Sequence, residues 1–349
     1  MAVTLIQLGA GKVGRALIRE ALFLRDGPRF LAVLDSSGGA LREEGLTEGT
    51  LREILAAKEK GERLASLPYG LGREEALSRV KELLRAEPGI LVDVTAAEET
   101  VELLLAALEH GWGVVLANKK PLVGPLETYR RLTSSGRLRY EATVGAGLPV
   151  IATLEALLSS GDEVQRIQGI LSGTLGYIVS RVEEGVPFSA AVREARERGY
   201  TEPHPAEDLS GMDVARKALI LARTLGLPLE LGDVAVEPLC PPETAELPVE
   251  EFLEELRRLD GEFRARCEGA KRRGEKLRYV AEVSPQGCVV GLAEVEGESP
   301  LGAARGPENV IVFWSRRYRE HPLVISGPGA GPVCTAAGVL ADIVRLAER

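Results

Sequence analysis

The sequence is poor in several features that mark particular classes of protein. Its four cysteines lie far apart with no metal-ligand spacing, which argues against a zinc site and favours a reducing compartment. No apolar run is long enough to span a membrane, and the first residues lack the basic stretch of a signal peptide. We therefore expect a cytoplasmic protein with no membrane partner.

Acidic residues outnumber basic ones. The 349 residues include 43 Lys and Arg against 52 Asp and Glu, which gives a net charge of -9. This balance argues against nucleic acid as a partner and leaves a small-molecule substrate as the simpler expectation. The hydrophobic fraction of 45% is ordinary for a globular protein, and the length suffices for two domains.

A dinucleotide-binding fingerprint stands near the N-terminus. Residues 3–8 predict a strand, residues 15–24 a helix, and residues 30–34 a second strand that ends at Asp35. Between the first strand and the helix lies the run Gly9-Ala10-Gly11-Lys12-Val13-Gly14. Strand, glycine turn, helix, strand and acid in this order predict a Rossmann-like unit.

The glycines of this turn have distinct physical roles. Gly9 permits the tight turn, Gly11 lets the backbone approach a pyrophosphate, and Gly14 lets the helix and strand pack closely. Lys12 and Val13, in the same turn, are further candidates for cofactor contact. The alternative is a glycine-rich turn that binds no ligand.

Strands and helices continue to alternate beyond the fingerprint, which predicts an α/β fold. Helices are expected at residues 50–62, 73–84 and 99–110, and apolar strands at residues 90–95 and 113–117. The rest of residues 36–88 is expected to be loop. Lys119 follows the second of these strands, at the sheet edge where such folds bind ligands. An ordinary solvated lysine accounts for this position equally well.

The alternation stops near residue 138, which predicts a change of domain. A helix at 151–158 and a strand at 164–171 follow, and Ser172-Gly173-Thr174 is expected to be a flexible turn. The charges of residues 249–272 predict one solvated helix, and strands are expected at 277–283, 289–295 and 310–314. Near the C-terminus a glycine-rich turn leads into an apolar helix from Thr335, which we expect to return to the cofactor.

We accordingly expect three segments. They are a Rossmann-like NAD(P)-binding domain at residues 1–138, an α+β substrate and dimerisation domain at 139–320, and a C-terminal segment at 321–349 that packs back on the first.

The segment 201–223 is the strongest candidate for chemistry. Asp213 and Lys217 are four residues apart in a predicted helix, so a carboxylate and an ammonium share one helix face. Glu202 and Asp208 add two acids just before it. An ordinary solvent-exposed ion pair is the alternative explanation of Asp213 and Lys217. The apolar body of the helix favours a packed site instead.

Six segments together resemble homoserine dehydrogenase. They occur in the family's order and cover nearly the whole chain: GAGKVG at 9–14, ANKKPL at 117–122, YEATVGAGLPVI at 140–151, GILSGTLGYI at 169–178, GYTEPHPAEDLSGMDVARK at 199–217 and GPGAGPVCTAAGVLAD at 327–342. The family's optional regulatory ACT domain needs more C-terminal sequence than remains here. The resemblance therefore implies the short form without it.

The resemblance implies an NAD(P)-dependent oxidoreductase that interconverts homoserine and aspartate 4-semialdehyde, a step towards threonine, methionine and isoleucine. It implies that Lys217 is the catalytic acid/base and Lys119 its partner near the nicotinamide. Glu202 and Asp213 are implied to hold the substrate's amino group or a bound water. Further lining of the substrate pocket is implied for Tyr200, Gly173, Thr174 and Asp208.

The resemblance also implies contacts to the cofactor, a cation and a second subunit. Thr95 and Gly331 are similar to positions that touch the cofactor. A sodium site is implied at Glu141, Val144, Ala146 and Leu148, where oxygen ligands on a glycine-rich bend suit a hard cation. A structural turn explains the same residues. The family also implies a homodimer formed through the second domain.

The choice between NAD and NADP rests on the end of the second strand. Asp35 favours a ribose 2′-hydroxyl and would repel a 2′-phosphate, so the sequence favours NAD. Arg42 and Lys58 are able to meet that phosphate if the loop folds inward.

Three residues depart from the family's pattern. Ser172 and Gly176 stand in a segment that usually carries asparagines, and His204 stands where aspartate is usual. These differences leave substrate contacts near Thr174 open. The rival interpretations are a related amino-acid or semialdehyde dehydrogenase, and a non-catalytic NAD-sensing protein that kept the fold.

Overall fold

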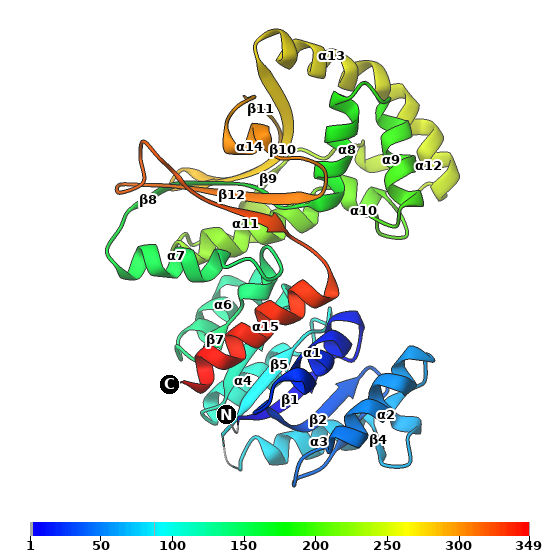
Figure 1. Cartoon of the computed structure of the whole chain (residues 1–349), viewed down its shortest axis with the longest axis vertical. Coiled ribbons are helices and arrows are strands. Elements are labelled where there is room, and N and C mark those ends of the chain that lie inside the picture. Colours follow the sequence, from blue (N-terminus) through cyan, green and yellow to red (C-terminus); the bar gives the residue numbers. More distant parts are fainter. Residues whose placement is uncertain (1–2, 87, 349) are drawn as a thin grey trace. The chain divides into compact units, whose positions relative to one another are not determined.

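The computed structural model describes residues 3–86 and 88–348, and the chain divides into two compact units (Figure 1). Unit 1 contains the chain up to Gly147 and from Ala330 onward, and unit 2 contains Leu148–Gly329. The boundaries predicted above lie at 138–139 and 320–321. Within the described ranges, no helix has the length and apolar character needed to cross a bilayer.

Unit 1 is built on a seven-stranded sheet, counted over the described residues, with the order β4-β3-β2-β1-β5-β6-β7. Neighbouring strands are parallel along the series β2-β1-β5-β6-β7. At the β2 edge, β3 and β4 are added through antiparallel pairs. The bounds are β1 Thr4–Leu8, β2 Arg29–Asp35, β3 Gly38–Leu41, β4 Gly70–Gly72, β5 Ile90–Asp93, β6 Gly113–Leu116 and β7 Leu138–Arg139. From β1 the chain runs to β2 on one side and later to β5 on the other, so a crevice opens at the carboxyl ends of these strands.

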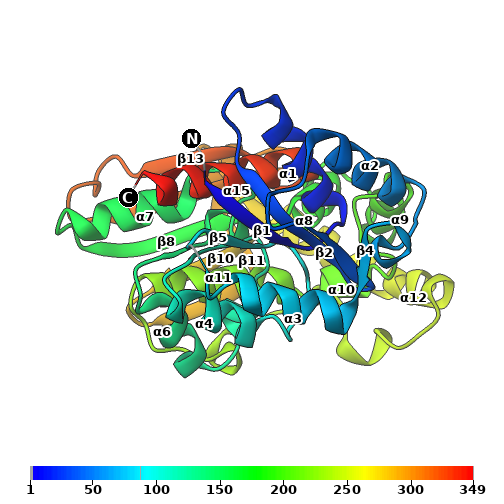
Figure 2. The ribbon, with the colours of Figure 1, turned by 90° about the horizontal axis from the view of Figure 1, so that it is seen from below.

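Helices cover both faces of this sheet, as Figure 2 shows for α1, α2 and α15 on one side and α3, α4 and α6 on the other. Their bounds are α1 Lys12–Phe23, α2 Glu48–Glu59, α3 Arg73–Leu83, α4 Val101–Glu109, α5 Lys120–Val123, α6 Leu126–Thr133 and α15 Pro332–Ala347. Two 3₁₀ turns lie at Leu64–Ser66 and Glu141–Thr143. Coverage on both faces explains why the central strands are continuous apolar runs.

The last helix, α15, returns to unit 1. It packs against α1, β5 and β6. Its buried residues Ala336, Val339 and Ile343 join the same core as Leu17 and Ile18 of α1. The expectation that the C-terminal helix returns to the nucleotide-binding domain is confirmed.

Unit 2 contains a six-stranded sheet, again counted over the described residues, with the order β13-β12-β8-β10-β11-β9. Its pairs are antiparallel except for β11 with β9. The bounds are β8 Val164–Ile170, β9 Ala235–Val236, β10 Glu275–Ser284, β11 Gly287–Glu296, β12 Glu308–Ser315 and β13 Leu323–Pro328.

Helix α11 covers one face of this sheet at β10 and β11. The helices of unit 2 are α7 Val150–Ser159, α8 Gly173–Glu183, α9 Phe188–Glu197, α10 Ala206–Leu209, α11 Met212–Thr224, α12 Val249–Glu255, α13 Asp260–Arg272 and α14 Pro300–Ala303. Further 3₁₀ turns lie at Leu231–Asp233, Pro242–Thr244 and Leu256–Leu259. On the face under α11, Tyr279, Ala281 and Val283 of β10 are buried.

Three predictions about elements are wrong. The single helix expected at 249–272 is interrupted by the 3₁₀ turn Leu256–Leu259, which separates α12 from α13. The turn expected at Ser172-Gly173-Thr174 is the start of α8, because the Ser172 hydroxyl accepts a hydrogen bond from the Leu175 N–H. The loop expected around residues 36–49 contains β3, which pairs with β2 through its backbone.

Candidate active site

The glycine turn of unit 1 is held by close backbone contacts. Gly9 has φ of +105° and its N–H donates to the Leu34 carbonyl at 2.8 Å. A methyl group at Gly14 would lie 2.1 Å from the Gly9 carbonyl oxygen, whereas one at Gly11 would meet no atom within 4 Å. Gly9 and Gly14 are therefore required by the turn itself. Gly11 leaves open space beside the backbone, as a ligand needs.

A residue that sequence reasoning missed supports this turn. The amide of Gln7, buried in β1, donates to the carbonyls of Gly9 at 2.8 Å and Gly14 at 3.2 Å. A single polar residue within an apolar strand was the available signal. Helix α1 then begins with Lys12 and Val13, and its N-cap, Gly11, provides no side-chain cap. The first N–H groups of α1 point outward with no side-chain acceptor, which is the arrangement that binds pyrophosphate.

Asp35 at the end of β2 is held by hydrogen bonds. Its carboxylate accepts from the Lys58 ammonium at 2.6 Å and from the Ser37 hydroxyl at 2.6 Å and backbone N–H at 2.8 Å. Burial raises the pKa of Asp35, but the hydrogen bonds from Lys58 and Ser37 more than offset this, so the pKa lies below its usual value. The group is an anion with a fixed orientation and a lysine already beside it.

A polar network joins the ends of β5 and β6. The carboxylate of Asp93, fully buried, accepts from the Thr95 hydroxyl at 2.7 Å and from the Asn118 amide at 3.0 Å. The Asn118 side-chain oxygen accepts from the Lys120 N–H at 3.1 Å, which fixes the backbone on both sides of the half-buried Lys119. Sequence reasoning missed the roles of Asp93 and Asn118, although an acid within an apolar strand was a visible signal.

The crevice edge thus gathers the predicted cofactor residues of unit 1 that follow β1, β2, β5 and β6. They are Gly9, Gly11, Lys12, Val13, Gly14, Asp35, Thr95 and Lys119. Gly331, with φ of +111°, is the N-cap of α15 in the same unit.

The bend at residues 141–147 has an unusual backbone. Gly145 has φ of +80° and Ala146 has φ of +56°, and among the described residues no other non-glycine residue has positive φ. Left-handed alanine is strained and is typical of functional sites. The neighbouring carboxylate of Glu141 is buried and pairs with Arg345 at 3.2 Å.

A second buried acid lies beside Glu141. Asp342 of α15 accepts from the Glu141 N–H at 2.8 Å and lies 3.1 Å from the Arg345 guanidinium. Burial raises the pKa of Asp342 to about 6, although the Glu141 N–H lowers it. Two buried carboxylates therefore lie beside the Arg345 guanidinium.

The catalytic candidates of unit 2 start at α11. Gly211 precedes this helix with φ of +72°, and a methyl group there would lie 2.0 Å from the Tyr279 hydroxyl. The Lys217 ammonium lies 2.9 Å from the Asp213 carboxylate and donates to the Leu171 carbonyl at 2.6 Å. The Lys217 side chain is only 12% exposed. The predicted pair on one helix face is therefore a packed, half-buried ion pair.

The geometry leaves Lys217 available for one more partner. An ammonium has three donors. Within the described residues, two of them are occupied by Asp213 and Leu171. The third is free for a substrate oxygen.

Predicted substrate residues contact one another, and Asp208 among them lies near Asp213. The Thr174 hydroxyl at the start of α8 donates to the Tyr200 carbonyl at 2.6 Å, and the Glu202 N–H donates to the Asp208 carboxylate at 2.8 Å. Burial, together with the charges of Glu202 and Asp213, raises the pKa of Asp208 to about 6, although hydrogen bonds from the Glu202 N–H and Thr174 lower it. The structure thus brings together the unit 2 residues expected at the site: Gly173, Thr174, Tyr200, Glu202, Asp208, Asp213 and Lys217.

The three departures from the family's pattern have structural explanations. Ser172 caps α8, as described above. A side chain at Gly176 would meet the Gly306 carbonyl oxygen at 2.9 Å. The His204 ring accepts from the Ala206 N–H at 3.2 Å and its other nitrogen lies 2.9 Å from the Leu247 carbonyl oxygen, so the ring joins the start of α10 to a distant loop.

Lys119 belongs to unit 1 and Lys217 to unit 2. Their meeting beside one nicotinamide ring stays a prediction. Leu148, an expected cation ligand, is the first residue of unit 2, whereas Glu141, Val144 and Ala146 belong to unit 1.

Known proteins resemble this chain along almost its whole length. Residues 149–344 match the family described as homoserine dehydrogenase, and residues 9–139 match its NAD binding domain. A homoserine dehydrogenase of Emericella nidulans is 35% identical over 98% of this chain and 97% of its own length. A chloroplastic bifunctional aspartokinase/homoserine dehydrogenase of Daucus carota is 39% identical over 98% of this chain and 38% of its own length.

The chain spans about a third of the length of such bifunctional relatives. Among solved structures, a hyperthermophilic archaeal homoserine dehydrogenase in complex with NADPH has a TM-score of 0.76 and 25% identity. That likeness covers 100% of this chain and 98% of the other.

Proposed function

The chain belongs to the homoserine dehydrogenase family, and from this premise we propose that it catalyses the NAD(P)-dependent interconversion of L-homoserine and L-aspartate 4-semialdehyde. The observation that carries the proposal is the Lys217 ammonium, which is packed between Asp213 and the Leu171 carbonyl with one donor free. This reaction supplies homoserine to the synthesis of threonine, methionine and isoleucine. The free thiols of the chain agree with a reducing cytoplasm.

The residues of unit 2 suit this chemistry. NAD(P), when bound by the glycine turn of unit 1, would supply the hydride chemistry at the carbon that becomes the aldehyde. In oxidation, Lys217 in its neutral amine form accepts the proton of the homoserine hydroxyl and becomes an ammonium, and in reduction the ammonium returns that proton to the carbonyl oxygen. Its positive charge stabilises negative charge that develops on this oxygen. Glu202 and Asp208 offer carboxylates to the substrate's ammonium group, and Lys119 adds a second cation near the reacting end.

Steady-state turnover tests the proposal. Purified protein with homoserine and NAD or NADP is expected to produce reduced cofactor, followed by its absorbance. Lys217→Ala is expected to lower kcat about 10³-fold, because it removes the general acid/base. Lys119→Ala is expected to lower kcat as well.

The matched control is Arg216→Ala, which removes the neighbouring cation of α11 and should keep most of the activity. Cofactor affinity, measured by calorimetry, should stay unchanged in Lys217→Ala. Absence of turnover with either cofactor across the pH range would support the NAD-sensing interpretation. Turnover with a different amino alcohol alone would support a related dehydrogenase.

We propose that NAD is preferred over NADP. Asp35 keeps its negative charge at neutral pH and is oriented by Lys58 and Ser37. A carboxylate in this position accepts hydrogen bonds from the ribose hydroxyls and repels a 2′-phosphate. Lys58 offsets part of that repulsion, so the preference is expected to be moderate.

We also propose that the bend in unit 1 holds a sodium ion. The left-handed Gly145 and Ala146 turn backbone carbonyls in a way that suits oxygen coordination of a hard cation. Val144 and Ala146 would contribute carbonyl oxygens, and Glu141 would contribute charge. A cation at the bend would lie close to the buried carboxylates of Glu141 and Asp342. The role of Leu148 as a further ligand of this ion stays a prediction.

We propose a homodimer formed through the sheet of unit 2. The sheet face opposite α11 carries Val289 and Val324, which are 56% and 41% exposed, and Trp314 beneath the Arg166 guanidinium. A groove of about 460 Å³ lies on this face, lined in part by Gln168, Val280 and Glu282. Exposed apolar residues beside aromatic and arginine side chains are typical of protein interfaces.

A further inference from the structure

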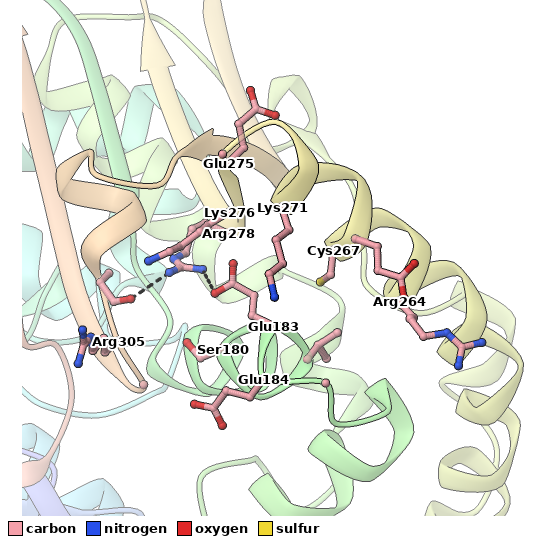
Figure 3. A pocket seen from close by; sticks show the side chains of 16 residues that line it. Ser180, Glu183, Glu184, Arg264, Cys267, Lys271, Glu275, Lys276, Arg278 and Arg305 are labelled. Atoms are coloured by element: carbon pink, nitrogen blue, oxygen red, sulfur yellow. Dashed lines mark hydrogen bonds and ion pairs between the residues drawn. The ribbon is translucent and has the colours of Figure 1, made fainter.

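Unit 2 contains a cavity that is lined by none of the catalytic candidates (Figure 3). It measures about 760 Å³, a size typical of small-molecule sites. Its walls are α13, the last turn of α8, the start of β10 and the link from α14 to β12. The catalytic candidates Gly173 and Thr174 lie at the other end of α8, which is about 16 Å long. None of the predicted site residues lines the cavity.

A buried arginine holds the walls together. The Arg278 side chain is only 4% exposed and pairs with Glu183 of α8 at 2.6 Å. Its remaining N–H groups donate to the carbonyls of Leu277, Leu301, Gly302 and Ala304. All five guanidinium donors are therefore used. Arg278 therefore connects the walls of the cavity and has no donor left for a ligand. Any ligand must be bound by other side chains.

The acids of the cavity are mostly neutralised by partners. Glu183 pairs with Arg278, Glu184 with Arg181, and Glu275 with Arg273 at 2.7 Å. Within the described residues, Glu268 is the one lining carboxylate that has no ion pair.

The cations show the opposite pattern. Arg264, Lys271 and Arg305 make no ion pair or hydrogen bond through their side chains within the part of the chain described by the structure. Lys276 donates only to the Gly302 carbonyl, at 2.9 Å. Among the described lining residues, four cations therefore have no carboxylate partner, whereas one carboxylate, that of Glu268, has no ion pair. This local excess of positive charge occurs in a protein whose net charge is -9.

The spacing of these cations favours an extended ligand. Arg264 and Lys271 lie seven residues apart on α13, so they share a helix face about 10 Å apart. Arg305 comes from a different wall, the link before β12. In Figure 3 Lys271 points into the space between α13 and α8. One anionic group does not reach all of these cations, whereas a molecule with two or more does.

We propose that this cavity binds a small organic polyanion that carries phosphate or carboxylate groups at two or more positions. The site is separate from the proposed redox site, and its test does not depend on turnover. Unpaired cations around a concave wall raise the local concentration of anions. Charge-assisted hydrogen bonds from lysine and arginine then hold them.

Cys267 provides a local readout. It lies on α13 between Arg264 and Lys271 and lines the cavity. Burial raises the pKa of its thiol to about 11, and the charge of Glu183 adds to this effect, so alkylation at pH 8.5 is slow enough to follow. Peptide mass spectrometry after iodoacetamide labelling would report on Cys267 alone, with Cys334 of unit 1 as an internal reference.

Tripolyphosphate and citrate serve as the probes, at ionic strength matched with NaCl. We expect at least one of them to slow labelling of Cys267 about fivefold and to leave Cys334 unchanged. Protection by tripolyphosphate alone identifies a phosphate-bearing ligand, and protection by citrate alone identifies a carboxylate-bearing one. Protection by neither overturns the proposal.

Two neighbouring variants of α13 distinguish binding in the cavity from a general effect of the protein's charge. Lys271→Ala removes a cavity cation, whereas Arg272→Ala removes an exposed cation that does not line the cavity. Protection is expected to disappear in Lys271→Ala and to persist in Arg272→Ala. Equal protection in both variants, with unchanged melting temperatures, contradicts the assignment.

Discussion

Asp208 is a carboxyl group that folding removes partly from water and places near two other acids, Glu202 and Asp213. Its ordinary pKa is 3.8, and burial followed by the neighbouring charges raises it to about 6 in the folded protein. Between these values the folded protein binds the proton more tightly than the unfolded chain does. The contribution of Asp208 to stability therefore falls as pH rises from about 4 to about 6.

Asp208→Asn removes this cost while the amide oxygen can still accept the Glu202 N–H. At pH 8 we expect the variant to be more stable by about 1 kcal/mol, allowing for the partial exposure of the group. At pH 4 the difference should vanish, because the wild-type carboxyl is then protonated when folded. Thermal melts across this pH range measure the effect. Glu207→Gln, an exposed change on the same short helix, should show no such pH dependence.

The same variant should also weaken substrate binding. Loss of one carboxylate from the acid cluster is expected to raise the KM for homoserine, and an unchanged KM would remove Asp208 from the proposed substrate site.

Asp35 sets the expected choice of cofactor. Asp35→Ala removes the carboxylate that repels a 2′-phosphate and frees the Lys58 ammonium, which lies 2.6 Å away in the wild type. We expect the ratio of kcat/KM for NADP to that for NAD to rise about tenfold, equivalent to about 1.4 kcal/mol. Glu59→Gln, which changes the charge next to Lys58, is the control. A ratio that stays constant would show that Asp35 does not contact the ribose.

At the scale of elements, the turn between β1 and α1 contains one glycine that the fold requires, Gly14, and one that leaves space for a ligand, Gly11. Gly14→Ala places a methyl group 2.1 Å from the Gly9 carbonyl, so we expect a loss of about 1–3 kcal/mol in stability and a lower melting temperature. Gly11→Ala meets no atom within 4 Å. It should keep the melting temperature of the apoprotein and raise the Kd for NAD about tenfold, since the methyl group occupies space near the pyrophosphate.

The comparison of the two variants is the informative result. Melting curves of the apoprotein and calorimetric titration with NAD measure the two properties separately. Equal destabilisation by both substitutions would contradict the distinction between a structural and a ligand-binding glycine.

The same distinction explains which elements the sequence could predict. Strands β1 and β5 are short, mostly apolar runs, and their predicted positions are confirmed within two residues. The start of helix α8 was missed because Ser172-Gly173-Thr174 suggests a flexible turn. In the structure Gly173 and Gly176 allow close contact with Pro307 and Gly306, which are distant in the sequence. Strand β3 was missed because it is held by backbone pairing with β2, which leaves no apolar pattern.

The candidate site could be predicted where one short segment carries its chemistry. The spacing of Asp213 and Lys217 gave the ion pair directly, because the helix period sets it. The Lys217 bond to the Leu171 carbonyl joins residues 46 positions apart, and no local pattern indicates it. Gln7 and Asn118 act through backbone carbonyls and a buried acid, so their roles depend on tertiary structure.

At the scale of the whole molecule, the open sheet face of unit 2 is the test of assembly. We expect light scattering to give the mass of a dimer for the wild type. Val324→Asp places a charge among the exposed apolar residues of that face and should give a monomer at micromolar concentration. Phe23→Asp, on an exposed position of unit 1, should leave the mass unchanged. A wild-type protein that is already monomeric would exclude the proposed dimer.

Helix α15 gives the chain an order of completion during synthesis. Unit 2 is one uninterrupted stretch, so all of it is translated before α15. The earlier part of unit 1 is translated before unit 2, yet its core lacks Ala336, Val339 and Ile343 until α15 has been made. The dinucleotide-binding unit therefore acquires its complete core only after the whole of unit 2 has been synthesised, which delays cofactor capture until then.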